Sequence, residues 1–196
     1  MLLVAVIVVL DSPGAGPIFS QTRIGLDGKP FTFYKFRSMI PNAEEQLEGL
    51  LHKNEMEGPV FKIKDDPRIT RFGRFIRMTS IDELPQLWNI FVGHMSLVGP
   101  RPERPLFVEK FKEEIPRYMV KHQVRPGLTG WAQVNGRKDV EWHKRIELNC
   151  WYVDNLSFAL DLKVFFMTIF KVLTNQDNLN TGETLVKNEE KEEVAK

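Results

Sequence analysis

The chain has 196 residues and carries 27 basic and 26 acidic side chains, so its net charge is only +1. A chain of this length fits one domain, which buries roughly 70% of the surface that it exposes when unfolded. Its apolar and charged fractions, 42% and 27%, are ordinary for a globular protein. The single cysteine, Cys150, excludes an internal disulfide and a metal cluster built on cysteines.

The first ten residues, MLLVAVIVVL, are all apolar. A helix of that length measures about 15 Å, half of the hydrocarbon thickness of a bilayer, so this segment cannot cross a membrane by itself. It also lacks the basic start and the small-residue cleavage site of a signal peptide. Two interpretations remain. The segment is the start of a buried strand or helix, or residues 1–17 are part of a re-entrant or interfacial membrane segment with its turn.

The next elements are predicted from apolar periodicity and from turn and capping residues. Two short strands are expected at 18–21 and 31–36, joined by a turn at Asp27-Gly28. Asn42, followed by acidic side chains, predicts a helix over 42–52. Further helices are expected over 68–77, 84–92, from the prolines at 102–105 through 111, over 140–153 and over 156–173, with short β-like runs in 125–137. One domain is expected over 18–174, and the tail 175–196 is expected to be disordered.

Two of these helices have unusual surfaces. The helix over 156–173 is apolar nearly all round, and such a helix is either buried in a core, which is the usual case, or in contact with lipid. In the helix over 68–77, basic side chains at 68, 71, 74 and 77 form a broad face opposite apolar and aromatic residues. This pattern is typical either of a helix in a membrane interface or of a solvated basic face over a core contact.

The segment SIDELP at 80–85 combines two adjacent carboxylates with a basic surrounding, since residues 62–77 have a net charge of +4. One interpretation is structural, because Ser80 and Glu83 match the S-x-x-E capping box. The other is catalytic. An aspartate can accept a phosphoryl group while the neighbouring carboxylate holds a metal ion. Such a reaction also needs cations, and Arg101, fixed between two prolines, is suited to bidentate phosphate binding.

Five motifs occur in order along the chain: KFRSM at 35–39, DPRIT at 66–70, TSIDELPQ at 79–86, MSLVGPRP at 95–102 and RPGLTG at 125–130. Together they resemble the bacterial sugar transferase family, the monotopic polyprenyl-phosphate phosphoglycosyltransferases, over about residues 11–173. The resemblance implies a helix-rich α/β catalytic domain with a small β component, membrane-interface helices and a partial N-terminal re-entrant segment.

The resemblance also implies roles for individual residues. Asp82 is implied as the nucleophile, and Glu83 as its partner that holds Mg²⁺. The implied phosphate-binding residues are Lys35, Arg37, Arg77 and Arg101, and the implied supporting residues are Asp161, Arg125 and Arg137. For Asp161 the alternative is an ion pair with Lys163 or Arg145.

By the same resemblance, the chain is expected to move a sugar phosphate from a UDP-sugar to polyprenyl (undecaprenyl) phosphate through a phosphosugar-Asp82 intermediate, releasing UMP. This would be the first step of bacterial surface polysaccharide assembly, at the cytoplasmic face of the inner membrane and in contact with membrane lipids. No nucleic-acid partner is expected. The alternatives are a non-catalytic membrane-associated binding module and a nucleotide-sugar hydrolase.

The chain departs from the family pattern at two places. Family members begin with a longer apolar segment that bends at a Ser-Pro pair, and this chain starts about where the second limb of that segment is expected. A truncated re-entrant segment is therefore predicted, either because the first limb has been removed or because the chain is a fragment of a longer protein. Asn149 stands where relatives often carry Asp, which removes one negative charge.

Overall fold

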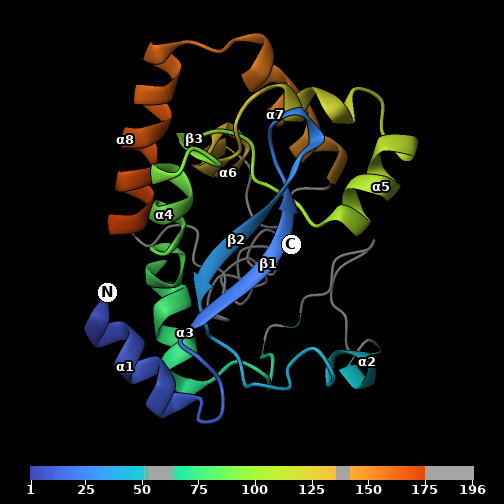
Figure 1. The fold of residues 1–196 in the computed structure, drawn as a ribbon. Coiled ribbons are helices and arrows are strands. Elements are labelled where there is room, and N and C mark those ends of the chain that lie inside the picture. Colours follow the sequence, from blue (N-terminus) through green and yellow to red (C-terminus); the bar gives the residue numbers. More distant parts are fainter. Residues whose placement is uncertain (51, 53–62, 64, 136–141, 175–196) are drawn as a thin grey trace, which may run out of the picture.

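The computed structural model describes residues 1–50, 52, 63, 65–135 and 142–174, and a hairpin crosses the middle of the molecule with helices on both sides (Figure 1). The α-helices are α1 (Leu2–Asp11), α2 (Leu47–Leu50), α3 (Arg71–Met78), α4 (Gln86–Phe91), α5 (Pro105–Glu114), α6 (Trp131–Asn135), α7 (Trp142–Asp154) and α8 (Phe158–Thr174). The strands are β1 (Ile18–Ile24), β2 (Pro30–Phe36), β3 (Ser96–Val98) and β4 (Gly127–Thr129), and the 3-10 helices are η1 (Leu26–Gly28), η3 (Ile81–Glu83) and η4 (Tyr118–Gln123). A helix-rich domain with a small β component is confirmed. The predicted tail, 175–196, lies outside the described residues.

Strands β1 and β2 form the hairpin that the sequence predicts. They pair antiparallel along all seven residues of each strand. In the turn, Asp27 and Gly28 adopt positive φ angles of 56° and 71°. A glycine and a short acidic side chain tolerate this conformation, which explains why the turn falls there. Phe33 and Phe36 of β2 are buried and anchor the hairpin to the helices.

A second, parallel sheet joins β3 to β4, and the sequence analysis did not predict β3. It places the Gly-rich stretch 125–130 against the segment that carries Arg101. The two backbones approach so closely that a Cβ atom on Gly99 would lie 2.4 Å from the carbonyl oxygen of Arg125. Glycine is therefore required at position 99, and this close contact fixes the start of the Arg101 loop.

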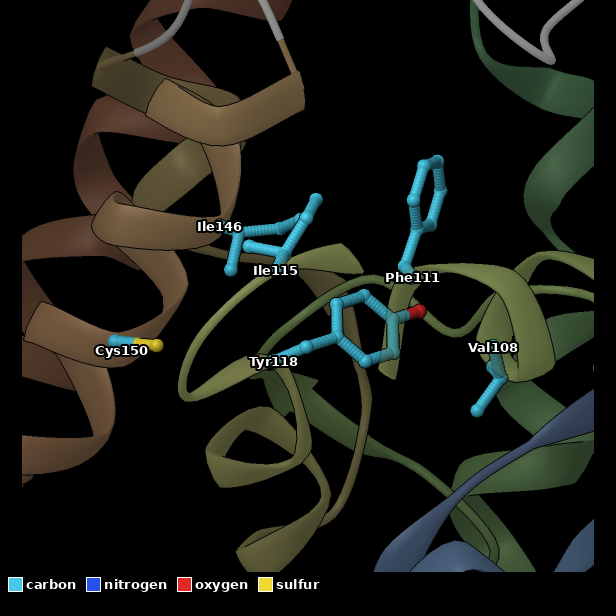
Figure 2. Packing of buried hydrophobic residues seen from close by; sticks show 6 residues of the cluster. All are labelled: Val108, Phe111, Ile115, Tyr118, Ile146 and Cys150. Atoms are coloured by element: carbon cyan, nitrogen blue, oxygen red, sulfur yellow. The ribbon is translucent and has the colours of Figure 1, made fainter. Parts of the chain in front are cut away.

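Three clusters of buried apolar side chains hold the elements together. The first joins α5, η4 and α7 (Figure 2) and consists of Val108, Phe111, Ile115, Tyr118, Ile146 and Cys150. The second joins β3, α6, α7 and α8 through Val98, Val134, Tyr152 and Val164. The third joins α1, β2 and α3 through Val8, Phe36 and Ile76. Together they fix the segments that carry the predicted site residues.

The apolar N-terminal segment is a helix, α1, and not a buried strand. Val8 packs against Phe36 and Ile76 of the third cluster. In contrast, Leu2 and Leu10 are 81% and 76% exposed. One face of α1 thus belongs to the core and the rest of its apolar surface is uncovered. Its insertion into a membrane stays a prediction.

The expectation that the helix over 156–173 is buried in a core is wrong. Val164 is the buried residue of α8, whereas Phe158 and Leu173 at its two ends are 83% and 80% exposed. The helix contacts α6, β3 and β4 along one side. A uniformly apolar helix sequence does not show whether the helix is buried in protein or exposed at the surface, because both kinds of helix can have the same apolar side chains. Among the described residues, no helix has both the length and the apolar character needed to span a bilayer.

The basic helix begins later than predicted, at Arg71. Thr70 caps it, since its hydroxyl accepts a backbone N–H of the first turn at 2.9 Å. Arg68 lies before the helix and is buried against Asp66, with 2.6 Å between Nη2 and Oδ2. The predicted basic face is therefore wrong at position 68, while Arg71 and Arg74 are exposed as expected.

Other bounds also differ from the prediction. The helix expected over 42–52 is reduced to α2, preceded by turns over 41–46. The helix expected from 84 begins at Gln86. Residues 140 and 141, the expected start of α7, lie outside the described residues. Helices α6 and η4 were not predicted, because segments of five and six residues are too short to show a helical period.

Candidate active site

The adjacent carboxylates Asp82 and Glu83 lie on η3, a single 3-10 turn between α3 and α4. Ser80 precedes it in the left-handed region, with φ of 57°, which turns the chain sharply after α3. The Ser80 side chain makes no capping hydrogen bond. The capping-box interpretation is therefore wrong, and the Glu83 carboxylate instead binds cations from β2 and from the segment after β3.

Glu83 is the centre of a cluster of opposite charges. Its Oε1 accepts hydrogen bonds from Lys35 Nζ at 2.8 Å and from Arg101 Nη2 at 2.7 Å, and its Oε2 lies 3.4 Å from Arg101 Nη1. Burial by itself raises the pKa of this carboxyl, but the charges and hydrogen bonds of Arg101 and Lys35 outweigh burial and hold the pKa of Glu83 well below its usual range. Glu83 is therefore ionised at neutral pH.

Asp82 lies in a different environment from its neighbour. Its side chain is 9% exposed, and Lys35 Nζ lies 3.6 Å from its Oδ2. Burial raises the pKa of Asp82, Lys35 lowers it in part, and the charge of Glu83 raises it again, so that the pKa lies above the usual range. Adjacent carboxyl groups with pKa values shifted in opposite directions are typical of catalytic sites.

Arg77, in the last turn of α3, is close enough to Asp82 for the two charges to attract each other. Its Nε donates a hydrogen bond to Ser38 Oγ at 2.7 Å. Burial lowers the pKa of the Arg77 guanidinium, and the attraction of Asp82 and Asp66 opposes this shift. The fold thus gathers three of the predicted cations, Lys35, Arg77 and Arg101, around the carboxylate pair from three separate segments.

Asn89 of α4 fixes the strand that carries Lys35. Its side chain is fully buried. Its Nδ2 donates to the carbonyl oxygen of Thr32 at 2.6 Å, and its Oδ1 accepts from the backbone N–H of Tyr34 at 3.2 Å. The amide therefore provides hydrogen-bond partners for backbone groups on the edge of β2 that does not pair with β1. The sequence analysis missed this residue, although a polar side chain within an apolar helix is a recognisable signal.

A buried ionic network holds the loop after Arg101. Glu103 Oε1 lies 2.9 Å from Lys121 Nζ, and these side chains are 9% and 2% exposed. The Tyr118 hydroxyl donates to the other carboxylate oxygen. The carbonyl oxygen of Glu103 accepts from Ile24 N at 2.9 Å. Both η4 and β1 thus fix the chain two residues after Arg101.

The remaining predicted residues have other partners or positions. Arg37 Nε donates to the carbonyl oxygen of Gly16 at 2.9 Å. Asp161 Oδ1 accepts from the Tyr152 hydroxyl at 2.6 Å, where α7 meets α8. Arg125 is exposed just before β4, and Arg137 lies outside the described residues. Phosphate binding by Arg37 and supporting roles for Asp161, Arg125 and Arg137 stay predictions.

Arg23 of β1 is a cation that the sequence analysis missed. Its Nη1 donates to the carbonyl oxygen of Pro102 at 3.2 Å, directly after Arg101. Its guanidinium lies 5.3 Å from the ring centroid of Phe33. A basic residue in an alternating, half-exposed strand gives no signal in the sequence, so its place beside Arg101 is known only from the fold.

Glu83 is a carboxylate that could hold Mg²⁺ together with a ligand. This ion usually takes one or two protein carboxylates, and waters and substrate phosphates complete its shell. Glu83 Oε2, with its longer contact to Arg101, is the less engaged oxygen of that carboxylate. Within the described ranges, no group of three or more His, Cys, Asp or Glu side chains is placed to hold a metal ion. Phosphate oxygens of a ligand would therefore complete this donor set.

Comparison with known proteins agrees with the motifs. The model of the family described as bacterial sugar transferase matches residues 1–175. The "uncharacterized sugar transferase EpsL" of Bacillus subtilis (strain 168) is 45% identical over 176 residues, which cover 90% of this chain and 79% of the relative.

Two further relatives are longer proteins. The "UDP-galactose-lipid carrier transferase" of Erwinia amylovora is 44% identical over 175 residues, covering 87% of this chain and 36% of the relative. The "UDP-glucose:undecaprenyl-phosphate glucose-1-phosphate transferase" of Escherichia coli (strain K12) is 40% identical over 178 residues, covering 88% and 36%. The chain thus spans about a third of the length of these two relatives. Because the family match covers the hairpin, the carboxylate pair and all three clusters, the chain belongs to the bacterial sugar transferase family.

Proposed function

We propose that the chain transfers a sugar phosphate from a UDP-sugar to polyprenyl phosphate, with Asp82 as the nucleophile and UMP as the leaving group. The names of relatives, which specify UDP-sugars and undecaprenyl phosphate, support these substrate classes. One observation carries the proposal. Asp82 is buried beside Lys35 with a raised pKa, and its neighbour Glu83 is ionised between Lys35 and Arg101.

In the first half-reaction, a carboxylate oxygen of Asp82 attacks the sugar-linked phosphorus of the donor. The bond from this phosphorus to the bridging oxygen of the diphosphate breaks, and UMP leaves with the electron pair. The phosphosugar stays on Asp82 as an acyl phosphate ester. Lys35, Arg77 and Arg101 place positive charge around the phosphoryl oxygens, where charge accumulates in the transition state.

In the second half-reaction, a phosphate oxygen of the polyprenyl phosphate attacks the same phosphorus. The bond between Asp82 and phosphorus breaks, the Asp82 carboxylate is restored, and polyprenyl-diphospho-sugar is released. UMP therefore leaves before the lipid reacts, which is a ping-pong order. Glu83 is proposed to hold Mg²⁺, which would supply further positive charge to the phosphoryl oxygens.

A lipid acceptor requires that the site be close to a membrane, and we propose that the chain rests on the cytoplasmic face of the bacterial inner membrane without crossing it. Helices α1, α3, α4 and α8 lie on one side of the hairpin in Figure 1. Their exposed apolar side chains include Leu2, Leu10, Phe75, Trp88, Phe91, Phe166, Phe170 and Leu173. The exposed Arg71 and Arg74 of α3 add positive charge that attracts anionic lipid.

The double substitution Trp88→Ser and Phe91→Ser is expected to weaken binding to vesicles at least about tenfold, because each side chain loses its transfer from water into lipid. These two rings stack 5.5 Å apart and are 57% and 81% exposed. Flotation with vesicles that contain anionic lipid measures the bound fraction. Leu106→Ser is the control, since Leu106 is 71% exposed but lies on α5, across the hairpin. Equal losses in the two variants would contradict this orientation.

The acid limb of the pH dependence of kcat/KM is expected to lie above the usual pKa range of an aspartate. The nucleophile must be ionised, and burial raises the pKa of Asp82. Activity should therefore rise with pH through this raised pKa. The measurement is the rate of UMP release at subsaturating donor across the acid range. A limb at or below the usual aspartate range would contradict the assignment of Asp82.

The experiment that tests the function is UMP release from a panel of UDP-sugars, in detergent with Mg²⁺, with and without undecaprenyl phosphate. Repeated turnover with one donor, only when the lipid is present, is the expected result. UMP and free sugar phosphate without lipid would instead indicate a hydrolase. A folded chain that binds vesicles and releases no UMP with any donor would contradict the transferase proposal.

A further inference from the structure

Arg23 is held by neutral partners only. Its guanidinium donates to the carbonyl oxygen of Pro102 and lies over the ring of Phe33. Its Nε is buried and has no hydrogen-bond acceptor. Within the part of the chain that the structure describes, Arg23 forms no ion pair with a carboxylate. Arg23 is partly buried, and a partly desolvated cation without a close counter-ion is costly, so this position favours an anionic ligand.

The two carboxylates whose charges act on Arg23, Glu103 and Glu83, are already engaged. Glu83 binds Lys35 and Arg101, and Glu103 binds Lys121. Burial lowers the pKa of Arg23 to about 10, and the charges of Arg101 and Arg104 lower it as well, more than Glu103 and Glu83 restore. An excess of positive charge therefore remains on the Arg23 side of the site after the protein's own ion pairs are formed.

Arg23 shares an aromatic contact with Lys35, the cation beside Asp82, because both lie near the Phe33 ring. Arg23 Cζ lies 5.3 Å and Lys35 Nζ lies 5.7 Å from the centroid of the same ring. The carbonyl group that orients Arg23 belongs to Pro102, the residue after Arg101. Arg23 thus lies at the border of the cluster around Glu83, with the planar fork of donors that suits a phosphate.

We propose that Arg23 binds the diphosphate of the nucleotide-sugar donor, at the phosphate that departs with UMP. The inference rests on the proposed function, because a donor with two phosphates presents one to Asp82 and needs a cation for the other. Arg23 is a positioning residue for the leaving group, and it is distinct from Lys35, which lies against Asp82. By stabilising the negative charge of the departing phosphate, it favours both binding of the diphosphate and cleavage of the bond between the sugar-linked phosphorus and the bridging oxygen.

The test compares Arg23→Met, Arg23→Lys and the control Lys29→Met by calorimetric titration with UDP and with UMP, together with the donor KM. Lys29→Met removes one charge from the same hairpin, at a side chain that is 79% exposed. Arg23→Met is expected to weaken UDP and UMP binding alike, each at least about tenfold, because both nucleotides carry the phosphate that Arg23 binds, and to raise the donor KM. Arg23→Lys should recover part of the loss, and Lys29→Met should bind both nucleotides as the unaltered chain does.

Unchanged UDP affinity in a folded Arg23→Met protein overturns the proposal, as does a loss for UDP with unchanged UMP affinity, which would place Arg23 at the sugar-linked phosphate instead. If Arg23→Met does not fold, Arg23→Lys decides, because wild-type affinity of that variant for both UDP and UMP also overturns the proposal. The titrations need neither lipid nor turnover. Weakened UDP binding without any transferase activity would thus contradict the proposed function alone, and normal turnover with unchanged UDP binding would contradict the role of Arg23 alone.

Discussion

Asp82→Asn is expected to lower lipid-dependent UMP release by at least about a thousandfold, because the amide cannot form the covalent bond to phosphorus. The substitution keeps the size of the side chain. Substrate binding should be largely retained, since Lys35, Arg77 and Arg101 remain in place. Rates of UMP release at saturating donor, with calorimetric binding of UDP as a second readout, measure both effects.

Asp82→Asn is also expected to change the stability of the folded chain. Because the pKa of Asp82 is raised in the folded state, that state binds a proton more tightly than the unfolded chain, and ionisation of Asp82 costs stability above the usual aspartate pKa. Asp82→Asn removes this cost, so at neutral pH the variant should be at least as stable to urea as the unaltered chain. Asp65→Asn is the matched control, since Asp65 forms an exposed pair with Arg74 and should change neither property. Full turnover by a pure Asp82→Asn protein would contradict the nucleophile assignment.

Lys121→Met is expected to lower the free energy of unfolding by about 3–5 kcal/mol, the cost of leaving a buried charge without its partner. Among the residues that the structure describes, Glu103 then keeps the Tyr118 hydroxyl as its one side-chain donor. The loss is large against the total stability of a domain, about 5–15 kcal/mol. Urea unfolding followed by circular dichroism measures it.

Lys110→Met is the control for this second prediction. Its side chain is 49% exposed and lies 3.9 Å from Glu114, so its loss should cost under about 1 kcal/mol. The ion pair of Glu103 should also show in the pH dependence. Burial raises the pKa of Glu103, but the charge of Lys121 and the Tyr118 hydrogen bond lower it overall, so the stabilisation is present above the unfolded pKa and is lost as the pH falls through the folded one. Equal effects of Lys121→Met and Lys110→Met would contradict the buried network.

Some features of the protein are decided by local sequence. The Asp27-Gly28 turn and its two strands were predicted because backbone sterics select those residues for positive φ angles. The adjacent pair of Asp82 and Glu83 was singled out because few segments place two carboxylates beside a run of basic residues. The capping interpretation of the same segment was wrong, because Ser80 is held in the left-handed region by the chain reversal after α3, which no local rule predicts.

Other features arise only from contacts between distant segments. Lys35 and Arg101 are neutralised by one carboxylate although they are 48 and 18 residues from Glu83 along the chain. The exposed surfaces of α1 and α8 could not be told from core, since an apolar side chain is the same whether protein or lipid covers it. The sequence by itself determined the family, the hairpin and the residues of the carboxylate pair, because these depend on motifs and on local backbone preferences. Only the tertiary structure decided that Asp82 is buried while Glu83 is paired, and that Arg23 and Asn89 belong beside them, because burial and electrostatic fields depend on every element that packs around a group.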